Sequence, residues 1–288
     1  AIEAALKLAK RLTNRPELVH FANAYHGGTA GALSMLGSET MKNAFRPLVP
    51  STRMLRFNDF GQLKQISENT AAVLVEPVQA EAGIILPEAG FLKALRDRCN
   101  ETGSLLIFDE IQMGFGRSGK LFAFEHYNVV PDILCLAKGM GGGMPIGAFI
   151  ASKEKMLALT HHPELGHITT FGGHPVSCAA SLATLQLILS MDLLSNAEKQ
   201  GKRFEEALVS HPFVKSVRRL GLMLGVELKN EIDIQDVMKA FKKNYLVVDQ
   251  FLFDEHAFRI APPLTITDEE TELSIEKIVN SFRLIKGL

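Results

Sequence analysis

Short apolar runs alternate with helical patterns along the first two thirds of the chain. Five runs of four to six residues are bounded by turn-forming residues, at 18–22, 71–75, 105–108, 133–136 and 146–151. Continuous apolar runs of this length are typical of buried parallel strands. Helical patterns lie between several of them, including 91–99 and a long helix over 175–194 that has Pro175 near its start. The alternation predicts an α/β domain with a mostly parallel sheet.

The pattern changes after about Asn196. Strands are expected at 214–217, 222–228 and around 258–260, with helices over 234–243 and 268–284. This order is typical of a smaller α+β domain. The sequence therefore predicts a large domain over 1–195 and a small C-terminal domain over 196–288, in agreement with a length of 288 residues at roughly 150 residues per domain.

The chain opens directly into an amphipathic helical pattern over 1–10, with no initiator methionine and no N-cap residue before it. We therefore expect that an N-terminal part of the large domain precedes these residues in the intact protein. A basic opening helix is also compatible with a targeting peptide, but Glu3 speaks against that interpretation.

Charge and hydropathy exclude two classes of partner. Lysine and arginine number 31 against 32 aspartate and glutamate residues, so the formal net charge of −1 creates no long-range attraction for nucleic acid or an anionic membrane. The most apolar long stretch, 178–189, is interrupted by Ser181, Thr184 and Gln186 and is too short for a bilayer span. We expect no nucleic-acid and no membrane partner.

Cysteine usage points to a reducing compartment. The three cysteines, Cys99, Cys135 and Cys178, are an odd number at wide spacing, which argues against a disulfide framework and against a CxxC metal site. Four histidines lie between 161 and 174, but they lack paired spacing on one helical face, so no metal site is predicted. A cytoplasmic location is expected.

Chemically active side chains follow the predicted strands. In open α/β sheets ligands bind beyond the carboxyl ends of the strands. Four such ends carry an aromatic residue, several carboxylates and a lysine: 25–28, 76–81, 109–112 and 137–139.

A glycine-rich run at 114–120 follows the third end and matches GxGxxG. It nearly matches a phosphate-binding loop, but Leu121 stands where a hydroxyl residue is needed. Asp109 and Glu110 precede the run, and no helical pattern opens behind Lys120. A connecting loop is favoured, and a nucleotide-binding enzyme remains an alternative.

Lys138 and Asp109 form a chemically coherent pair. An apolar strand delivers Lys138, and 139–143 is glycine-rich, which leaves space around the amine. A desolvated lysine can form a Schiff base with a carbonyl group. Asp109 ends another strand 29 residues earlier, and a carboxylate that faces a pyridinium nitrogen keeps it protonated, as pyridoxal phosphate chemistry requires.

Five segments together resemble a known family. They are 75–83, 108–120, 131–138, 169–175 and 259–264, which span essentially the whole chain in order. They closely resemble the class III (ω-amino) aminotransferases of pyridoxal phosphate (PLP) fold type I. The resemblance implies a large, mostly parallel α/β/α domain with a small C-terminal α+β domain. It also implies that the glycine-hydroxyl loop for the cofactor phosphate lies upstream of Ala1.

The resemblance assigns cofactor contacts to the strand ends. It implies that Lys138 carries PLP as a Schiff base, that Asp109 pairs with the pyridine nitrogen, and that Gln112 lies near the phenolic oxygen. Tyr25 is expected to stack on the ring, with His26 beside it as a further cofactor contact.

Thr170 matches a threonine that reaches the phosphate of the neighbouring subunit's cofactor. A homodimer with shared active sites is therefore implied, although Thr170 considered alone also suits a helix-entry cap.

Substrate contacts follow from the same resemblance. Arg259 is implied as the clamp for the carboxylate of glutamate or 2-oxoglutarate, a task that suits a guanidinium fork. Glu81 resembles the carboxylate that neutralises this arginine when a substrate with a terminal amine binds. Glu76 is a further candidate for substrate contact. By composition alone, charged residues such as Glu81 and Arg259 are expected at the surface.

The implied activity is ping-pong transfer of a terminal amino group to 2-oxoglutarate. The donor is a diamine or basic amino acid of the putrescine, ornithine or N-acylornithine type. Gly28 stands where acetylornithine and ornithine aminotransferases usually have an arginine, which favours a diamine. Another fold-type I enzyme, such as an aminomutase, and a non-catalytic descendant of the family remain alternatives.

Overall fold

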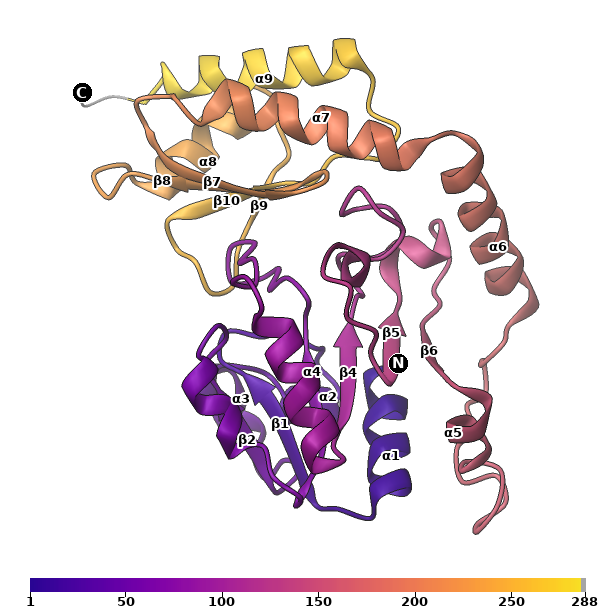
Figure 1. Ribbon diagram of the computed structural model, residues 1–288. Coiled ribbons are helices and arrows are strands. Elements are labelled where there is room, and N and C mark those ends of the chain that lie inside the picture. The colour runs from indigo at the N-terminus through magenta and orange to yellow at the C-terminus, as the bar shows by residue number, and fades with distance from the viewer. Residues whose placement is uncertain (286–288) are drawn as a thin grey trace. The chain divides into compact units, whose positions relative to one another are not determined.

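The computed structural model describes residues 1–285 (Figure 1), and their contacts divide them into two compact units. The first unit comprises Ala1–Val78, Pro87–Gly114 and Ala123–Leu187. The second comprises Gln79–Leu86, Phe115–Phe122 and the chain from Ile188 onward. The backbone therefore passes between the units five times. The domain division at residues 195 and 196 stays a prediction about the intact protein.

The first unit is built on a six-stranded sheet in the order β2-β1-β3-β4-β5-β6. Its strands are β1 (Glu17–Phe21), β2 (Thr52–Leu55), β3 (Thr70–Val75), β4 (Leu105–Asp109), β5 (Ile133–Leu136) and β6 (Ala148–Ala151). β1 to β5 are mutually parallel. This confirms the predicted mostly parallel α/β arrangement.

The prediction for 146–151 was wrong in direction and in burial. β6 pairs antiparallel with β5 at the edge of the sheet and is half-exposed. Parallel strands need a crossover connection of about a dozen or more residues, and the link 137–147 contains only the short turn η4 (Lys138–Gly141). β2 was not predicted, because its burial pattern has only one fully buried residue and its sequence lacks an apolar run.

Helices cover both faces of this sheet. On one face α1 (Ile2–Thr13) packs Leu6, Leu8 and Ala9 against alternate strand residues such as Leu74 and Ile107. On the other face α4 (Phe91–Thr102) places the ring of Phe91 6.0 Å from that of Phe21. Because successive side chains of a strand point to opposite faces, the apolar strand runs serve both layers at once.

The remaining helices and turns of the first unit are mostly short. They are α2 (Ala30–Ser34), α3 (Glu39–Lys42), η1 (Asn43–Phe45), η2 (Phe60–Gln65), η3 (Ala123–His126), α5 (Lys153–Leu157) and most of α6 (Pro175–Ser190). The predicted long helix over 175–194 is interrupted, since α6 ends at Ser190 and α7 (Leu193–Leu208) starts three residues later. Asp192 between them has a left-handed φ of 51°, which breaks the helix.

The second unit has an antiparallel sheet in the order β7-β8-β10-β9. Its strands are β7 (Val214–Leu220), β8 (Met223–Leu228), β9 (Asp249–Gln250) and β10 (Ala257–Ile260). α7, α8 (Ile234–Lys243) and α9 (Asp268–Phe282) enclose its core with the sheet, where Phe241, Phe258 and Phe282 form one aromatic cluster. α9 starts with a capping box in which Thr267 and Glu270 each accept the other's backbone N–H.

No single helix within residues 1–285 is long and apolar enough to cross a membrane. The consecutive helices α6 and α7 meet the criteria of length and composition only when they are taken together across the break between them.

Gly221 is required where three segments of the second unit meet. Its φ is +57°, and a Cβ atom there would lie 2.2 Å from the backbone carbonyl carbon of Ser118. We predict that Gly221→Ala lowers the free energy of unfolding by roughly 1–3 kcal/mol, the usual cost of overpacking. The difference is measured as a lower Tm or urea midpoint.

Gly28→Ala serves as the control, because a Cβ atom at Gly28 meets nothing within 4 Å. A Tm for Gly221→Ala equal to that of Gly28→Ala would contradict this packing.

Candidate active site

A buried carboxylate stands at the carboxyl end of β4. Asp109 is 5% exposed. One carboxylate oxygen, Oδ1, accepts the backbone N–H of Ile111 at 3.0 Å, and Oδ2 accepts Nδ1 of His26 at 2.8 Å. Because an ionised carboxylate can only accept, Nδ1 of His26 carries the proton in this contact. The orientation of the Asp109 side chain is thus fixed from two sides.

The loop that follows β1 crosses the end of β3 to reach Asp109. β3 lies between β1 and β4 in the sheet. On the way, the backbone N–H of Tyr25 donates to Oε2 of Glu76, the first residue after β3, at 3.3 Å. Glu76 is buried, and through this hydrogen bond it holds the backbone that carries Tyr25 and His26. Its role in substrate contact stays a prediction.

Lys138 follows the neighbouring strand. In the β4–β5 pair, Asp109 is opposite Cys135, three residues before Lys138. Lys138 is exposed and has a left-handed φ of 46°. A left-handed backbone is uncommon for a lysine and is found at functional turns. The sheet register therefore places the lysine and the carboxylate at adjacent strand ends.

The glycines after Lys138 allow α6 to approach the η4 turn. A Cβ atom at Gly142 would lie 2.0 Å from Oγ1 of Thr184 in α6. Gly142 and Gly143 both have positive φ, at 55° and 102°. The glycine run thus serves close packing as well as turn formation.

Two further predicted cofactor residues, Gln112 and Thr170, lie on different segments of the chain. Gln112 is half-buried in the turn directly after β4. Thr170 is exposed on the loop before α6 and, within residues 1–285, forms no hydrogen bond with another candidate site residue. The contact that the resemblance implies for Thr170 involves a second subunit and stays a prediction.

Glu110 holds both ends of the segment Phe115–Phe122, which belongs to the second unit. Its carboxylate accepts the backbone N–H groups of Ala123 at 2.6 Å and Phe124 at 2.7 Å, and its carbonyl accepts the N–H of Gly114 at 2.9 Å. Burial raises the pKa of Glu110 to about 7, although these two hydrogen bonds to the carboxylate oppose the shift. Sequence reasoning gave Glu110 no role, because its partners lie 13 and 14 residues away.

The glycine-rich run is an anchored connection. Its Arg117, in the second unit, donates to the carbonyl oxygens of Leu222 and Pro262 at 3.1 and 2.6 Å. Burial lowers the pKa of this guanidinium to about 10. The arrangement supports the interpretation as a connecting loop.

The second unit contains a buried arginine–glutamate pair. Nη1 of Arg259 lies 2.8 Å from Oε1 of Glu81, with both side chains only 12% and 10% exposed. Nη2 of Arg259 pairs with Asp249, and the guanidinium carbon lies 5.5 Å from the ring centre of Phe251. Burial lowers the pKa of Arg259, but hydrogen bonds and charge from Glu81 and Asp249 outweigh it and raise the pKa overall.

Sequence reasoning missed Asp249 and Phe251. Both lie ten or fewer residues before Arg259 in an unremarkable segment. Only the pairing of β9 with β10 reveals them, and a two-residue strand leaves little signal in a sequence.

The donor set of the first unit fits a pyridoxal phosphate ring. Each oxygen of Asp109 accepts one N–H and keeps capacity for another, as a protonated pyridine nitrogen requires. Nε2 of His26 is buried without a hydrogen-bond partner in the described part of the chain. Lys138, which carries a primary amine, follows the adjacent strand β5. These are the groups that the cofactor needs for charge pairing and covalent attachment.

A metal centre receives no support from these residues. Over positions 1–285, no group of three or more histidine, cysteine, aspartate or glutamate side chains is arranged to hold a metal ion. The exposed His161 and His162 have their ring centres 5.4 Å apart, in an edge-to-face contact.

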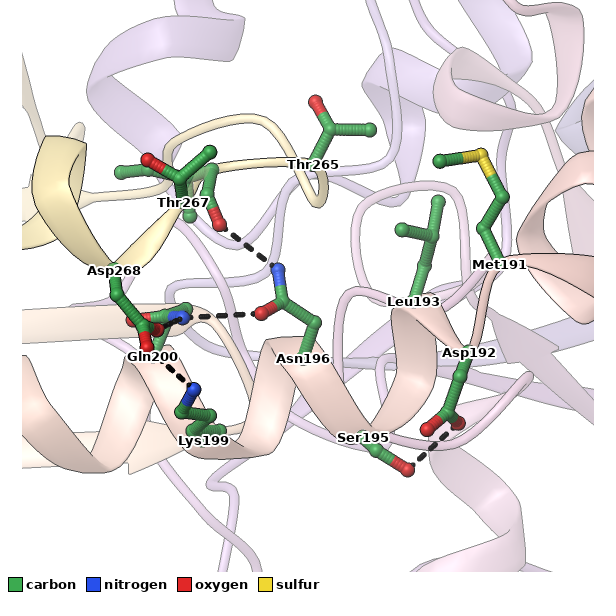
Figure 2. Close-up of a pocket in the computed structure, with 11 residues that line it drawn as sticks. Met191, Asp192, Leu193, Ser195, Asn196, Lys199, Gln200, Thr265, Thr267 and Asp268 are labelled. Carbon is green, nitrogen blue, oxygen red and sulfur yellow. Dashed lines mark hydrogen bonds and ion pairs between the residues drawn. The ribbon is translucent and has the colours of Figure 1, made fainter.

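A cavity of about 520 Å³ lies at the start of α7 in the second unit (Figure 2). Several of its polar side chains form hydrogen bonds within the second unit. Nδ2 of Asn196 donates to the carbonyl oxygens of Leu264 and Ile266, and Gln200 and Lys199 both bond Asp268. Its lining residues include none of the predicted site residues.

Comparisons with known proteins identify the family of the chain. Residues 1–282 match the family model for class III aminotransferases. The ornithine aminotransferase of Toxoplasma gondii, whose structure has PLP at the active site in partial occupancy, is 32% identical with a TM-score of 0.91, over 99% of this chain and 70% of that chain.

Two further solved structures are similar. An amine transaminase from an uncultivated Pseudomonas species, in a PLP-bound form, is 28% identical with a TM-score of 0.88, over 98% of this chain and 74% of that chain. The ornithine δ-aminotransferase of Plasmodium falciparum is 30% identical with a TM-score of 0.81, over 98% and 71%.

Glu110 is expected to make stability depend on pH. Its pKa is about 7 in the folded protein against an ordinary value of 4.5. The unfolded chain therefore releases this proton first, and stability falls as pH rises from about 4.5 to 7. We predict that Glu110→Gln removes this component, which amounts to at most roughly 3 kcal/mol between the two limits.

The test is Tm against pH for both proteins, measured on either side of this window. The wild type should lose stability relative to Glu110→Gln as pH rises, while Glu101→Gln, at an exposed glutamate, should follow the wild type. Parallel curves for the wild type and Glu110→Gln would contradict the burial argument.

Proposed function

The chain belongs to the class III aminotransferases, which are PLP-dependent transaminases, and from this premise we propose the following reaction. The enzyme transfers the terminal amino group of a diamine or basic amino acid, of the putrescine, ornithine or N-acylornithine type, to 2-oxoglutarate. The two half-reactions alternate in a ping-pong mechanism. The observation that carries the substrate proposal is the buried Glu81–Arg259 pair at 2.8 Å.

The first unit supplies the groups that hold and serve the cofactor. When bound, PLP supplies an aldehyde that exchanges amino groups and a ring that accepts electrons. Lys138 would attach it through Nζ, and Asp109 would accept the hydrogen of the ring nitrogen, while His26 holds the carboxylate in place. Tyr25 would cover the ring, and Gln112 would contact the phenolic oxygen.

Lys138 also moves the proton. Once Nζ is a free amine, it would remove a proton from the donor carbon that carries the transferred amino nitrogen. It would then return a proton to the carbon on the opposite side of that nitrogen. A lysine is suited to both tasks because its neutral amine is a base as well as a nucleophile. Asp109 would support the transfer by keeping the ring nitrogen of the bound cofactor protonated.

Arg259 and Glu81 let two unlike substrates use one pocket. When the part of the donor that faces Arg259 carries an amine and no carboxylate, Glu81 neutralises Arg259. When 2-oxoglutarate or glutamate binds, its carboxylate pairs with the guanidinium of Arg259 and displaces the Glu81 side chain. The burial of both side chains makes the exchange selective, since an unpaired buried charge is costly. Glu76 contributes by holding the Tyr25 backbone.

We also propose a homodimer in which Thr170 contacts the phosphate of the partner's cofactor. The exposure of Thr170 supports this assignment. The three cysteines are free thiols, which supports the proposal of a reducing, cytoplasmic setting.

The test is amino transfer by the full-length protein loaded with PLP. Putrescine, ornithine and N-acetylornithine are each offered with 2-oxoglutarate, and glutamate formation is measured. At least one terminal-amine donor is expected to react with parallel-line kinetics. Lys138→Ala should reduce the rate by roughly a hundredfold to ten-thousandfold, while Lys120→Ala, at an exposed lysine, should not.

Other outcomes contradict parts of the proposal. Reaction only with α-amino donors such as alanine would show that the donor class is wrong. Rearrangement of an amine without net transfer to 2-oxoglutarate would instead favour an aminomutase.

A further inference from the structure

Arg259 has a second acidic partner that the strand register imposes. β9 and β10 pair antiparallel, with Asp249 directly opposite Arg259. Side chains of directly opposed residues share one face of the sheet and lie within contact distance. Nη2 of Arg259 accordingly pairs with the Asp249 carboxylate. Phe251, one residue beyond β9, supports the guanidinium by a cation–π contact at 5.5 Å.

The other side of Arg259 is kept open for Glu81. On β8 the residue opposite Arg259 is Gly225, and a Cβ atom there would lie 2.6 Å from the carbonyl oxygen of Gly83. Arg218 donates through Nε to that same carbonyl at 2.5 Å. The absent side chain therefore lets the segment 79–86 pack on the sheet with its glutamate next to the arginine.

The backbone of Glu81 is fixed within the second unit. Its carbonyl accepts the N–H of Phe253 at 3.1 Å. Release of the Glu81 side chain therefore does not require the segment 79–86 to leave the sheet.

The three charged groups are unbalanced. One guanidinium faces two carboxylates, so the trio carries a formal charge of −1. A substrate carboxylate that binds an arginine end-on uses one N–H of each Nη atom in parallel, and here Nη1 pairs with Glu81 and Nη2 with Asp249. An acid that binds in this way therefore competes with both partners. The Asp249 side chain is 71% exposed against 10% for Glu81, so the two are displaced at different cost.

We propose that Asp249 is a specificity-determining residue which competes with the carboxylate of acidic substrates for Nη2 of Arg259 and favours donors that carry a terminal ammonium group. The inference rests on the proposed role of Arg259 as the carboxylate clamp. Asp249 raises the concentration of 2-oxo acid that the enzyme needs, and it supplies a negative charge that attracts the second amine of a diamine.

Asp249→Asn tests this competition, because asparagine keeps the size and loses the charge. Glutarate, which has no oxo group to react, is titrated into the PLP-loaded full-length protein by calorimetry, and its Ki against 2-oxoglutarate is measured. Asp249→Asn should lower both constants by about two- to fivefold, the range expected for one solvent-exposed ion pair. The KM for putrescine should rise while kcat stays within about twofold of the wild type, since one exposed pair is lost and no reacting group changes.

Asp236→Asn is the matched control. Asp236 is an exposed aspartate of the same unit that pairs with Lys239 at 2.9 Å. It should leave the glutarate constants at their wild-type values. Asp249→Ser provides a second variant, and Tm values for all variants exclude a general loss of folding. The advantage of Asp249→Asn over wild type should also shrink at high salt, since ions screen an exposed pair.

The outcomes separate this inference from the proposed function. Equal glutarate constants for wild type, Asp249→Asn and Asp249→Ser would overturn the role of Asp249 while leaving transamination intact. Failure of the wild type to bind glutarate and to form glutamate from 2-oxoglutarate would instead overturn the role of Arg259, and with it both proposals.

Discussion

The buried hydrogen bond between Nδ1 of His26 and Oδ2 of Asp109 is the contact on which the strand-end site depends. It joins the loop after β1 to the end of β4 across the intervening strand β3, where Glu76 holds the Tyr25 backbone. With the Ile111 N–H on the other oxygen, it keeps a nearly inaccessible carboxylate oriented. Such preorganised charge is what an electron-accepting ring requires. The β4–β5 register then brings the strand of Lys138 beside it.

The second unit holds a different kind of electrostatic device. Its arginine pairs with one buried and one exposed carboxylate, and the geometry follows from strand register and from a glycine that leaves room for the Glu81 segment. Under the proposed function, the first unit holds the groups for the chemistry that is common to all substrates, and the second holds the groups that distinguish an acid from an amine. The chain passes between them five times, and Glu110 fastens two of these passages by its backbone and its carboxylate.

Much of this arrangement follows from local sequence. The apolar runs predict the buried strands, and the rule that ligands bind beyond strand ends reduces the search to four segments. The chemistry of a lysine paired with a carboxylate, together with the family resemblance, then selects Asp109 and Lys138 as the predicted pair. The family match confirms the resemblance and the PLP-dependent fold. Features that depend on contacts between residues far apart in the sequence could not be predicted in this way. The direction of β6 depends on a connection too short for a crossover, and the burial of Glu81 and Arg259 depends on segments 178 residues apart. The pairing of Asp249 depends on a strand of two residues.

The attachment point of the cofactor is the most direct test of the proposed site. The full-length protein is loaded with PLP, reduced with borohydride to make the lysine–cofactor bond permanent, digested, and mapped by mass spectrometry. The account predicts a pyridoxyl group on the peptide that contains Lys138 and on no other lysine peptide. Modification of Lys120 or Lys153 in its place, or no modified peptide from a protein that binds PLP, would contradict the assignment of Lys138 and Asp109 as the catalytic pair.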